Sequence, residues 1–273
     1  MENSSFDKDY VLNELNKLSE KTSIPVKLFI IGGLSIIHFG LKEATKDIDV
    51  VVLSKGELDV LVRSLKSLGY TTCSPLTIAE PYKKMAASKI LENRDGFRWD
   101  IFHRKVCGAL TFSTGTVSRA TDFYSKKLLK VMLVSKEDIF LFKGITEREA
   151  DLEDMRLLAE SGLDWKVIER ECRYQSDLSG ILWENALLQN LIDLREKHKI
   201  TSPIEKTLEI VVEEKLIEDA LIQAVKQGYV TIKMIYKNMT SKDVKLPEHL
   251  IRKHVKRMEE KGILKIDHVA PTN

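Results

Sequence analysis

The N-terminal half of the chain alternates helical periodicity with short, continuous apolar runs. Apolar residues recur on one helical face between Tyr10 and Leu18, whereas Val26 to Ile31 is a short apolar run between a proline and two glycines. Strands that alternate with helices predict a compact α/β or α+β unit. The predicted elements are helices over 10–18, 34–39 and 57–68 and strands over 26–31, 47–53, 97–102 and 130–134.

The pattern becomes wholly helical at Ser135. That serine is a predicted helix N-cap, and Asp138 three residues later resembles the acidic partner of a capping box. From there to about Lys199, apolar residues such as Leu152 and Met155 recur at helical spacing. This region therefore predicts a run of helices without strands.

A third segment follows Thr201-Ser202-Pro203, a step that is typical of a linker. Its apolar pattern and its glycines predict helices over 216–225, 232–239 and 247–261 and short strands over 229–231 and 263–269. Helix, strand, helix, helix, strand is the order of a winged helix. The chain is therefore predicted to have three parts, over residues 1–135, 136–202 and 203–273.

Composition excludes several classes of protein. Hydrophobic residues make up 43% of the 273 residues and charged residues 31%, a balance that excludes wholesale disorder. The longest nearly apolar run, Leu28 to Ile37, is far shorter than the roughly 20 residues that span a bilayer. The N-terminus lacks the pattern of a signal peptide, and three widely spaced cysteines fit a reducing compartment. We therefore expect a cytoplasmic protein with no membrane partner.

Two glycines separate the first predicted strand from the next helix. Gly32 and Gly33 let a phosphate approach the backbone closely, and the first N–H groups of a helix are donors for an anion. Ser35 adds a hydroxyl donor in the first turn. The pattern indicates a phosphate site at these three residues.

Three aspartates lie on two predicted strands. Asp47 and Asp49 are two residues apart, so both side chains point to one face. Asp100 lies between the apolar residues Trp99 and Ile101, where a carboxylate is costly without a partner or a metal. Carboxylates are the ligands that magnesium prefers, so the three acids predict a site for one or two Mg²⁺ ions, with Mn²⁺ as the alternative. An isolated Asp-x-Asp is more often an ordinary solvated strand end.

In combination, these motifs resemble the DNA polymerase β-like nucleotidyltransferase superfamily. Its signature is a hydrophobic strand, Gly-Gly or Gly-Ser, a short gap, Asp-x-Asp and a distant aspartate on another strand. Gly32-Gly33, Asp47-Ile48-Asp49 and Asp100 match that order. The resemblance implies a nucleotidyltransferase-type mixed sheet with flanking helices.

Within the superfamily, the chain is most similar to the AbiEii-like branch, which includes nucleotidyltransferase toxins. That branch has a Thr-x-Asp-(Ile/Leu)-Asp pattern, which Thr45 to Asp49 match. A later helix of the branch carries a lysine, an arginine and Asp-Leu-x-Asp, which Lys143, Arg148 and 151–154 match. Ala150 departs from the basic residue that is common at its position.

The resemblance implies a function for each motif. A Mg²⁺-dependent enzyme would move a nucleoside monophosphate from a nucleoside triphosphate, such as ATP, to an acceptor hydroxyl. Residues 1–135 would form the catalytic core, and 136–202 would complete the active site. In this scheme Gly32, Gly33 and Ser35 hold the triphosphate, Asp47 and Asp49 bind the metals, Asp100 binds the second metal or activates the acceptor, Lys143 reaches the triphosphate and Asp151 orients it.

The C-terminal segment is locally basic although the chain has a net charge of only +2. Between Lys226 and Lys265 there are eleven basic and four acidic residues. Ile251, Val255 and Met258 fall on one face of the last predicted helix. The four basic residues predicted to face outward and to contact nucleic acid are Arg252, Lys253, Lys256 and Arg257.

Two non-enzymatic hypotheses remain beside the nucleotidyltransferase. The chain can be a DNA-binding regulator that keeps the fold as a sensor, or a toxin–antitoxin component whose output is a complex with a cognate protein. Three retained acids argue against a dead site, because carboxylates held together repel one another. The acceptor stays open between a tRNA or other RNA end, a protein hydroxyl and a small molecule.

Overall fold

The computed structural model describes residues 6–73, 86–106, 108–145, 149–241 and 246–267. The chain divides into two compact units, residues 1–205 and 206–273. The first unit contains both the sheet and the helical region that follows it. Within the described ranges, no helix has the length and apolar character that crossing a bilayer requires.

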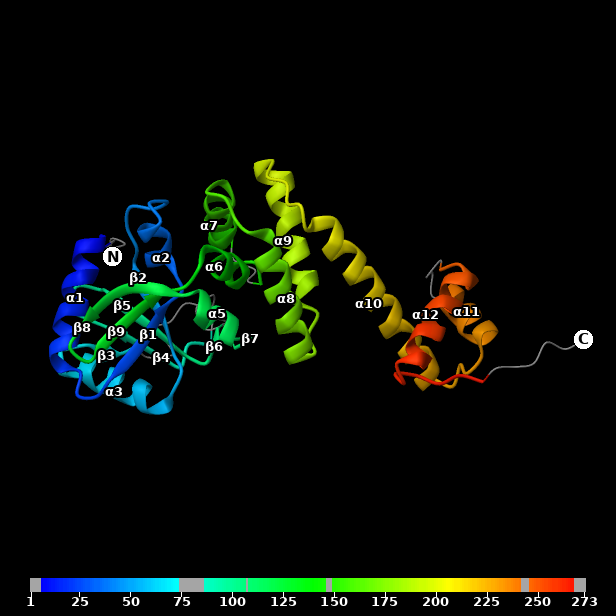
Figure 1. Ribbon diagram of the computed structural model, residues 1–273, viewed down its shortest axis with the longest axis horizontal. Coiled ribbons are helices and arrows are strands. Elements are labelled where there is room, and N and C mark those ends of the chain that lie inside the picture. The colour runs from blue at the N-terminus through cyan, green and yellow to red at the C-terminus, as the bar shows by residue number, and fades with distance from the viewer. Residues whose placement is uncertain (1–5, 74–85, 107, 146–148, 242–245, 268–273) are drawn as a thin grey trace, which may run out of the picture. The chain divides into compact units, whose positions relative to one another are not determined.

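A seven-stranded mixed sheet forms the centre of the first unit, in the order β3-β4-β5-β2-β1-β9-β8 (Figure 1). β1 pairs with β9 in parallel and with β2 antiparallel, and β2 pairs with β5 in parallel. A separate pair of short strands, β6 and β7, completes the β structure. The strands are β1 (Val26–Ile30), β2 (Asp47–Val52), β3 (Thr71–Thr72), β4 (Lys89–Glu92), β5 (Arg98–His103), β6 (Lys105–Val106), β7 (Leu110–Thr111), β8 (Thr121–Lys126) and β9 (Leu129–Leu133).

Helices α1 (Lys8–Lys21) and α3 (Lys55–Ser67) pack on one face of this sheet. Their apolar residues, among them Leu15 and Leu65, form a buried core with Trp99 and other inward-facing strand residues. Side chains begin both helices: Asp7 caps α1, and Ser54 and Glu57 form a capping box on α3. The short helices are α2 (Gly33–His38) and α5 (Thr114–Arg119).

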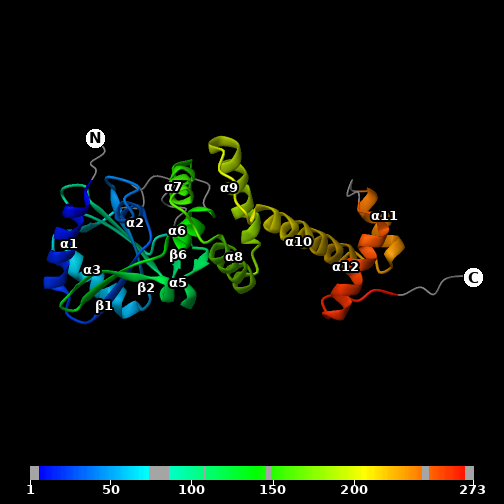
Figure 2. The ribbon, with the colours of Figure 1, turned by 45° about the horizontal axis from the view of Figure 1, so that its top comes forward.

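The region after Ser135 is helical, as predicted. Ser135 caps α6 by accepting a hydrogen bond from the backbone N–H of Asp138. In Figures 1 and 2, α6 and α7 lie between the sheet and α9. Arg119 of α5 joins this region by pairing with Asp138 of α6 at 2.6 Å and with Glu171 of α8 at 2.7 Å. The helices are α6 (Lys136–Lys143), α7 (Glu149–Glu160), α8 (Trp165–Ser179) and α9 (Trp183–His198).

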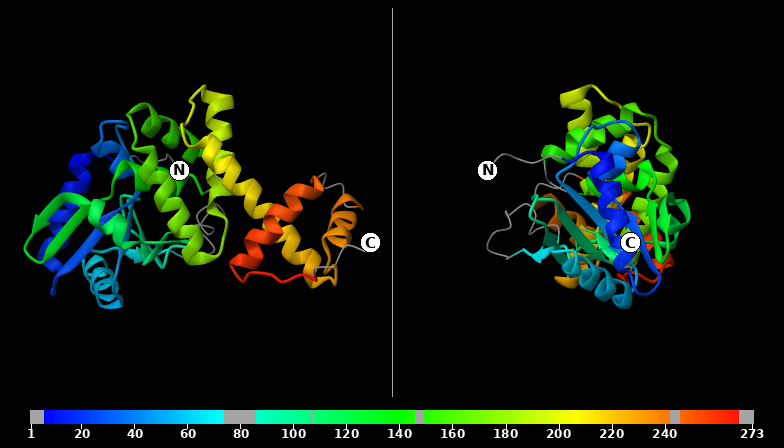
Figure 3. Two further views of the ribbon diagram at one scale, coloured as in Figure 1. Left: turned by 45° about the vertical axis from the view of Figure 1, so that its right-hand side comes forward. Right: turned by 90° about the vertical axis from the view of Figure 1, so that its left-hand side faces the viewer.

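The second unit is a small helical bundle with its own core. α10 (Glu205–Lys226) leads into it, followed by α11 (Ile232–Ser241) and α12 (Glu248–Glu260), which lie side by side in Figure 3. The apolar face predicted for the last helix is buried, and it packs with residues of α10 and α11. The core residues are Leu221, Ala224, Ile235, Met239, Ile251, Val255, Met258 and Ile266.

The two strands predicted for this unit are wrong for its described residues. Residues 229–231 and 263–267 form no strand, and 268–269 lie outside the described chain. The two segments meet through one backbone hydrogen bond, from the N–H of Asp267 to the carbonyl of Val230 at 2.7 Å. A single bond is too little pairing for a two-stranded wing. The helices of a winged helix are therefore present in the described residues without its strands.

Candidate active site

The strand arrangement brings three motifs that are distant in sequence to the same end of the central strands β1, β2 and β5. β1 runs antiparallel to β2, so the end of β1 lies beside the start of β2. β2 and β5 run in parallel and in register from their first residues, Asp47 and Arg98. The backbone N–H of Ile31 donates to the carbonyl of Asp49 at 3.1 Å. The glycines after β1 therefore meet the aspartates of β2 and β5.

The aspartates share one face of the sheet, as their spacing predicted. Asp49 pairs with Asp100 directly across the parallel β2–β5 ladder. Their side chains lie opposite the face that α1 and α3 cover, where Ile48, Trp99 and Ile101 are fully buried. Asp49 is 8% exposed and Asp100 is 1% exposed. Two carboxylates at such depth are costly unless cationic groups compensate them.

Both glycines are explained by what lies against them. A side chain on Gly32 would place its Cβ 1.8 Å from Oδ2 of Asp49 and 2.8 Å from its Cβ. A Cβ on Gly33 would lie 2.9 Å from the hydroxyl oxygen of Thr45. That hydroxyl donates to the carbonyl of Asp47 at 2.8 Å, and the backbone of Thr45 pairs with that of Phe6. The Gly-Gly and Thr-x-Asp-x-Asp motifs are therefore packed against each other.

Ser35 lies beneath this turn. Its side chain is fully buried, and its hydroxyl donates to the carbonyl of Ile30 at 3.3 Å. Its backbone N–H bonds to the carbonyl of Gly32 at 3.0 Å. The residue thus supports the Gly-Gly turn from within, whereas a contact with phosphate stays a prediction.

Arg98 joins two of the three acids. Its guanidinium contacts Oδ2 of Asp47 at 2.5 Å and the two carboxylate oxygens of Asp100 at 2.7 and 3.0 Å. The arginine side chain is 21% exposed, so these pairs are only partly screened by water. Arg98 and Asp100 are two residues apart on β5 and share a face, but the sequence alone does not reveal the bridge to Asp47.

The three aspartates are chemically suited to bind a hard cation, but their side chains are not gathered around one position. Three carboxylates are the oxygen ligands that Mg²⁺ prefers. In the part of the chain that the structure describes, however, no three His, Cys, Asp or Glu side chains are gathered as metal ligands. Asp47 and Asp100 instead face the Arg98 guanidinium.

Lys143 lies at the end of α6 within a second charged cluster. Its ammonium group contacts Asp151 at 2.8 Å and Asp154 at 2.7 Å, both on α7, and Lys143 is 9% exposed. Burial lowers the pKa of Lys143, but Asp151 and Asp154 outweigh it and leave the pKa above its ordinary value. Asp154 is therefore a salt-bridge residue of this cluster. Arg148 lies outside the described residues.

Lys42 is part of this cluster and was missed from the sequence. Its ammonium group also pairs with Asp154, so it connects α7 to the loop before β2. That loop leads directly to Thr45 and Asp47. A lysine so far from Asp154 in the chain carries no short-range pattern, so only the fold could have revealed the pair.

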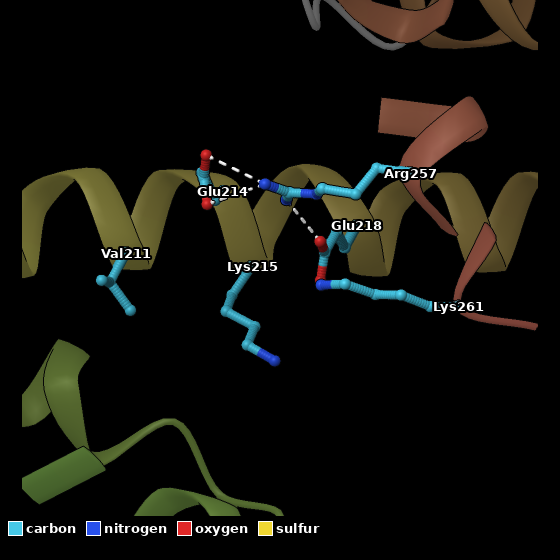
Figure 4. Close-up of a pocket in the computed structure, with 6 residues that line it drawn as sticks. All are labelled: Val211, Glu214, Lys215, Glu218, Arg257 and Lys261. Atoms are coloured by element: carbon cyan, nitrogen blue, oxygen red, sulfur yellow. Dashed lines mark hydrogen bonds and ion pairs between the residues drawn. The ribbon is translucent and has the colours of Figure 1, made fainter. Parts of the chain in front are cut away.

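The basic face predicted for α12 is only partly present. Arg252, Lys253 and Lys256 are exposed. Arg257 was predicted to face outward, and this is wrong: it reaches across to α10, contacting Glu218 at 2.5 Å and Glu214 at 3.2 Å. Figure 4 shows these ion pairs beside a cavity of about 110 Å³ between the two helices. The pairing turns the Arg257 guanidinium toward α10, and its contact with nucleic acid stays a prediction.

Comparison with known proteins gives structural similarity without sequence similarity. No protein-family model matches the chain, and no curated protein matches it. The lincosamide antibiotic adenylyltransferase LnuA, solved with lincomycin, is 16% identical and has a TM-score of 0.39; the match covers 58% of this chain and 99% of LnuA.

Two further solved structures show a similar relation. ANT(2'')-Ia, in complex with adenylyl-2''-tobramycin, is 16% identical with a TM-score of 0.42, over 62% of this chain and 97% of that one. JHP933 from Helicobacter pylori is 14% identical with a TM-score of 0.34, over 82% of this chain and all of that one. Because all three TM-scores lie below 0.5, the function proposed next rests on the residues of this chain.

Proposed function

We propose that this chain is a cytosolic, magnesium-dependent nucleotidyltransferase of the AbiEii-like type. The observation that supports it best is the pairing of Asp49 with Asp100 across β2 and β5, beside a glycine that leaves room for the Asp49 carboxylate. Buried carboxylates on neighbouring strands repel each other and raise the free energy of the fold unless cations neutralise them. Such an arrangement is expected where a cationic metal and a triphosphate bind together.

In the proposed reaction, the oxygen of an acceptor hydroxyl attacks the α-phosphorus of a nucleoside triphosphate. A new O–P bond forms, the bond to the oxygen that bridges to the β-phosphate breaks, and pyrophosphate leaves. Asp100 takes the proton of the acceptor hydroxyl as a general base. Asp47, Asp49 and Asp100 would hold Mg²⁺, which would supply charge stabilisation for the attacking and leaving oxygens.

The remaining residues position the triphosphate in this proposal. The backbone of Gly32 and Gly33 lies against the triphosphate, and Ser35 supports their turn through its bond to Ile30. Lys143 supplies positive charge, and its ion pairs with Asp151 and Asp154 fix the direction of its side chain. The helical region completes the site because α6 carries this lysine.

Label transfer tests the proposal. The full chain is incubated with Mg²⁺ and each α-labelled nucleoside triphosphate, with RNA, protein and hydroxyl-bearing small molecules as separate acceptor pools. We expect label in one pool and a loss of at least about a hundredfold in Asp49→Asn, since that change removes a charge from the reacting centre.

Asp59→Asn is the matched control, because Asp59 is exposed on α3, the helix that packs on the opposite face of the sheet. It should transfer label like the unchanged protein. Absence of transfer with every nucleotide and acceptor pool, or equal transfer by Asp49→Asn, contradicts the proposal. The labelled pool identifies the acceptor class, including an RNA target of a toxin.

The exposed basic residues of α12 favour a second candidate, a DNA-binding regulator. Arg252→Glu combined with Lys256→Glu should then weaken binding of a DNA fragment and reduce its salt dependence. Loss of DNA binding in this variant, in a protein without nucleotide transfer, favours the regulator. Co-purification of a stoichiometric protein favours a toxin–antitoxin complex instead.

A further inference from the structure

Arg98 occupies the centre of the acid cluster. It is the first residue of β5 and lies opposite Asp47 in the β2–β5 ladder. Asp100, two residues further on, projects from the same face of that strand. The guanidinium therefore reaches Asp47 across the ladder and Asp100 along its own strand, with three contacts between 2.5 and 3.0 Å.

The oxygens that Arg98 contacts are those that a divalent cation would need. Both carboxylate oxygens of Asp100 and one of Asp47 accept hydrogen bonds from the guanidinium. The guanidinium of an arginine is not deprotonated in proteins, so loss of a proton does not release these oxygens. A metal and the guanidinium therefore compete for one set of ligands.

We propose that Arg98 is an internal counter-cation of the acid cluster, and that a divalent metal binds there only by displacing its guanidinium. This inference rests on the proposed function, which places the metal at these acids. The arginine neutralises the carboxylates while no metal is bound, and the metal takes over that role when it enters. The site then has two states, one in which Arg98 supplies a single positive charge and one in which a divalent metal supplies two.

Binding of Mn²⁺ alone tests the exchange. The full chain is titrated with Mn²⁺ without nucleotide, and free Mn²⁺ is followed by electron paramagnetic resonance. We expect Arg98→Gln to bind Mn²⁺ roughly tenfold more tightly than the unchanged protein, because no charge-assisted bonds have to be broken first. Arg98→Lys, which keeps a charge but not the planar fork, should lie between the two.

Arg156→Gln is the matched control. Arg156 bridges two carboxylates as Arg98 does, namely Glu153 and Glu160, but on the surface of α7. The change removes the same charge from the chain, so any effect of net charge alone appears in both variants. We expect its affinity for Mn²⁺ to equal that of the unchanged protein.

Thermal unfolding shows whether the variant is folded. Without metal, Arg98→Gln should unfold at a lower temperature than the unchanged protein, and saturating Mn²⁺ should recover more of that loss than it adds to the unchanged protein. If Arg98→Gln does not fold, the Arg98→Lys titration decides alone. Mn²⁺ affinity that is unchanged or weaker in the Arg98 variants, or no binding by any of them, overturns the inference.

The two proposals fail in different ways. If Arg98→Gln binds Mn²⁺ more tightly but no label is transferred to any acceptor, the exchange stands and the enzyme does not. If label is transferred but metal affinity is indifferent to Arg98, the enzyme stands and the exchange does not.

Discussion

The charged residues of the two units differ in their burial and in their ion pairs. In the first unit they form buried clusters in which each cation contacts two carboxylates, at Arg98, Arg119 and Lys143. In the second unit most basic residues of α12 lie in water, and only Arg257 crosses to a neighbouring helix. Burying charged side chains raises the free energy of the folded state, so a buried charged cluster indicates a structural or functional role. The comparison directs the search for chemistry to the first unit.

Arg119→Gln should have the largest effect on stability. The change leaves Asp138 and Glu171, both buried, without their shared cation, and we expect a loss of about 3 kcal/mol in the free energy of unfolding. All three tryptophans lie in the first unit, so urea unfolding followed by tryptophan fluorescence reports on that unit.

The partner variant in the second unit is Arg252→Gln, which removes an exposed pair with Glu248 on α12. Far-ultraviolet circular dichroism includes this unit, and the expected change is below about 0.5 kcal/mol. Equal losses of unfolding free energy in Arg119→Gln and Arg252→Gln would show that a buried ion pair contributes no more to stability than an exposed one.

Gly32→Ala should have the next largest effect. Its new Cβ would overlap both Cβ and Cγ of Asp49, so rotation of the carboxylate cannot relieve the clash and the strands must move. We expect a cost of about 2 kcal/mol in the same fluorescence assay.

Gly262→Ala is the corresponding change in the second unit. Gly262 has a φ of 67°, and among the described residues no atom lies within 4 Å of the position that a Cβ would take, so backbone conformation alone costs about 1 kcal/mol. A Gly32→Ala protein as stable as the unchanged one would contradict the close packing of the Gly-Gly motif against Asp49.

Two histidines give the smallest effects, one in each unit. Burial, with help from Lys8, lowers the pKa of His38, and burial with Arg257 lowers the pKa of His254. Both groups therefore take up a proton more readily in the unfolded chain. The stability that they contribute is fully present above the ordinary pKa of 6.5, and it is lost as the pH falls through the lower pKa that each histidine has in the folded chain.

The free energy of unfolding should therefore be lower at about pH 5 than at neutral pH. His38→Gln should reduce this difference when unfolding is followed by fluorescence, and His254→Gln should reduce it when unfolding is followed by circular dichroism. A loss on acidification that neither substitution changes would assign the acid sensitivity to other groups. Fluorescence reports on the first unit alone, so a change that appears only in circular dichroism belongs to the second unit.

The sequence was sufficient where burial and local pattern agree. β1, β2, β5 and β9 were predicted because each contains several apolar residues that are buried, and α6 because Ser135 caps it. β8 was missed because its residues are polar and lie at the edge of the sheet, where one side faces no partner strand among the described residues. Strand identity thus follows from burial rather than from intrinsic preference alone.

For the candidate site, spacing predicted the shared face of the aspartates but not their cation. The contact of Arg98 with Asp47 depends on which strand lies beside β2, and the contact of Lys42 with Asp154 depends on where α7 packs. Arg257 was misplaced for the same reason, since its direction is set by two glutamates on α10. Partners that come from distant segments need the fold.

The backbone pairing of Phe6 with Thr45 has a practical consequence for handling the protein. Phe6 donates to Thr45 at 2.7 Å and accepts from it at 2.9 Å, and its ring packs against Tyr10 and Phe97. The residue whose hydroxyl bonds to Asp47 is thus anchored by Phe6. A proteolytic cut or a substitution next to Phe6 would therefore disturb the motif that the assays are meant to measure.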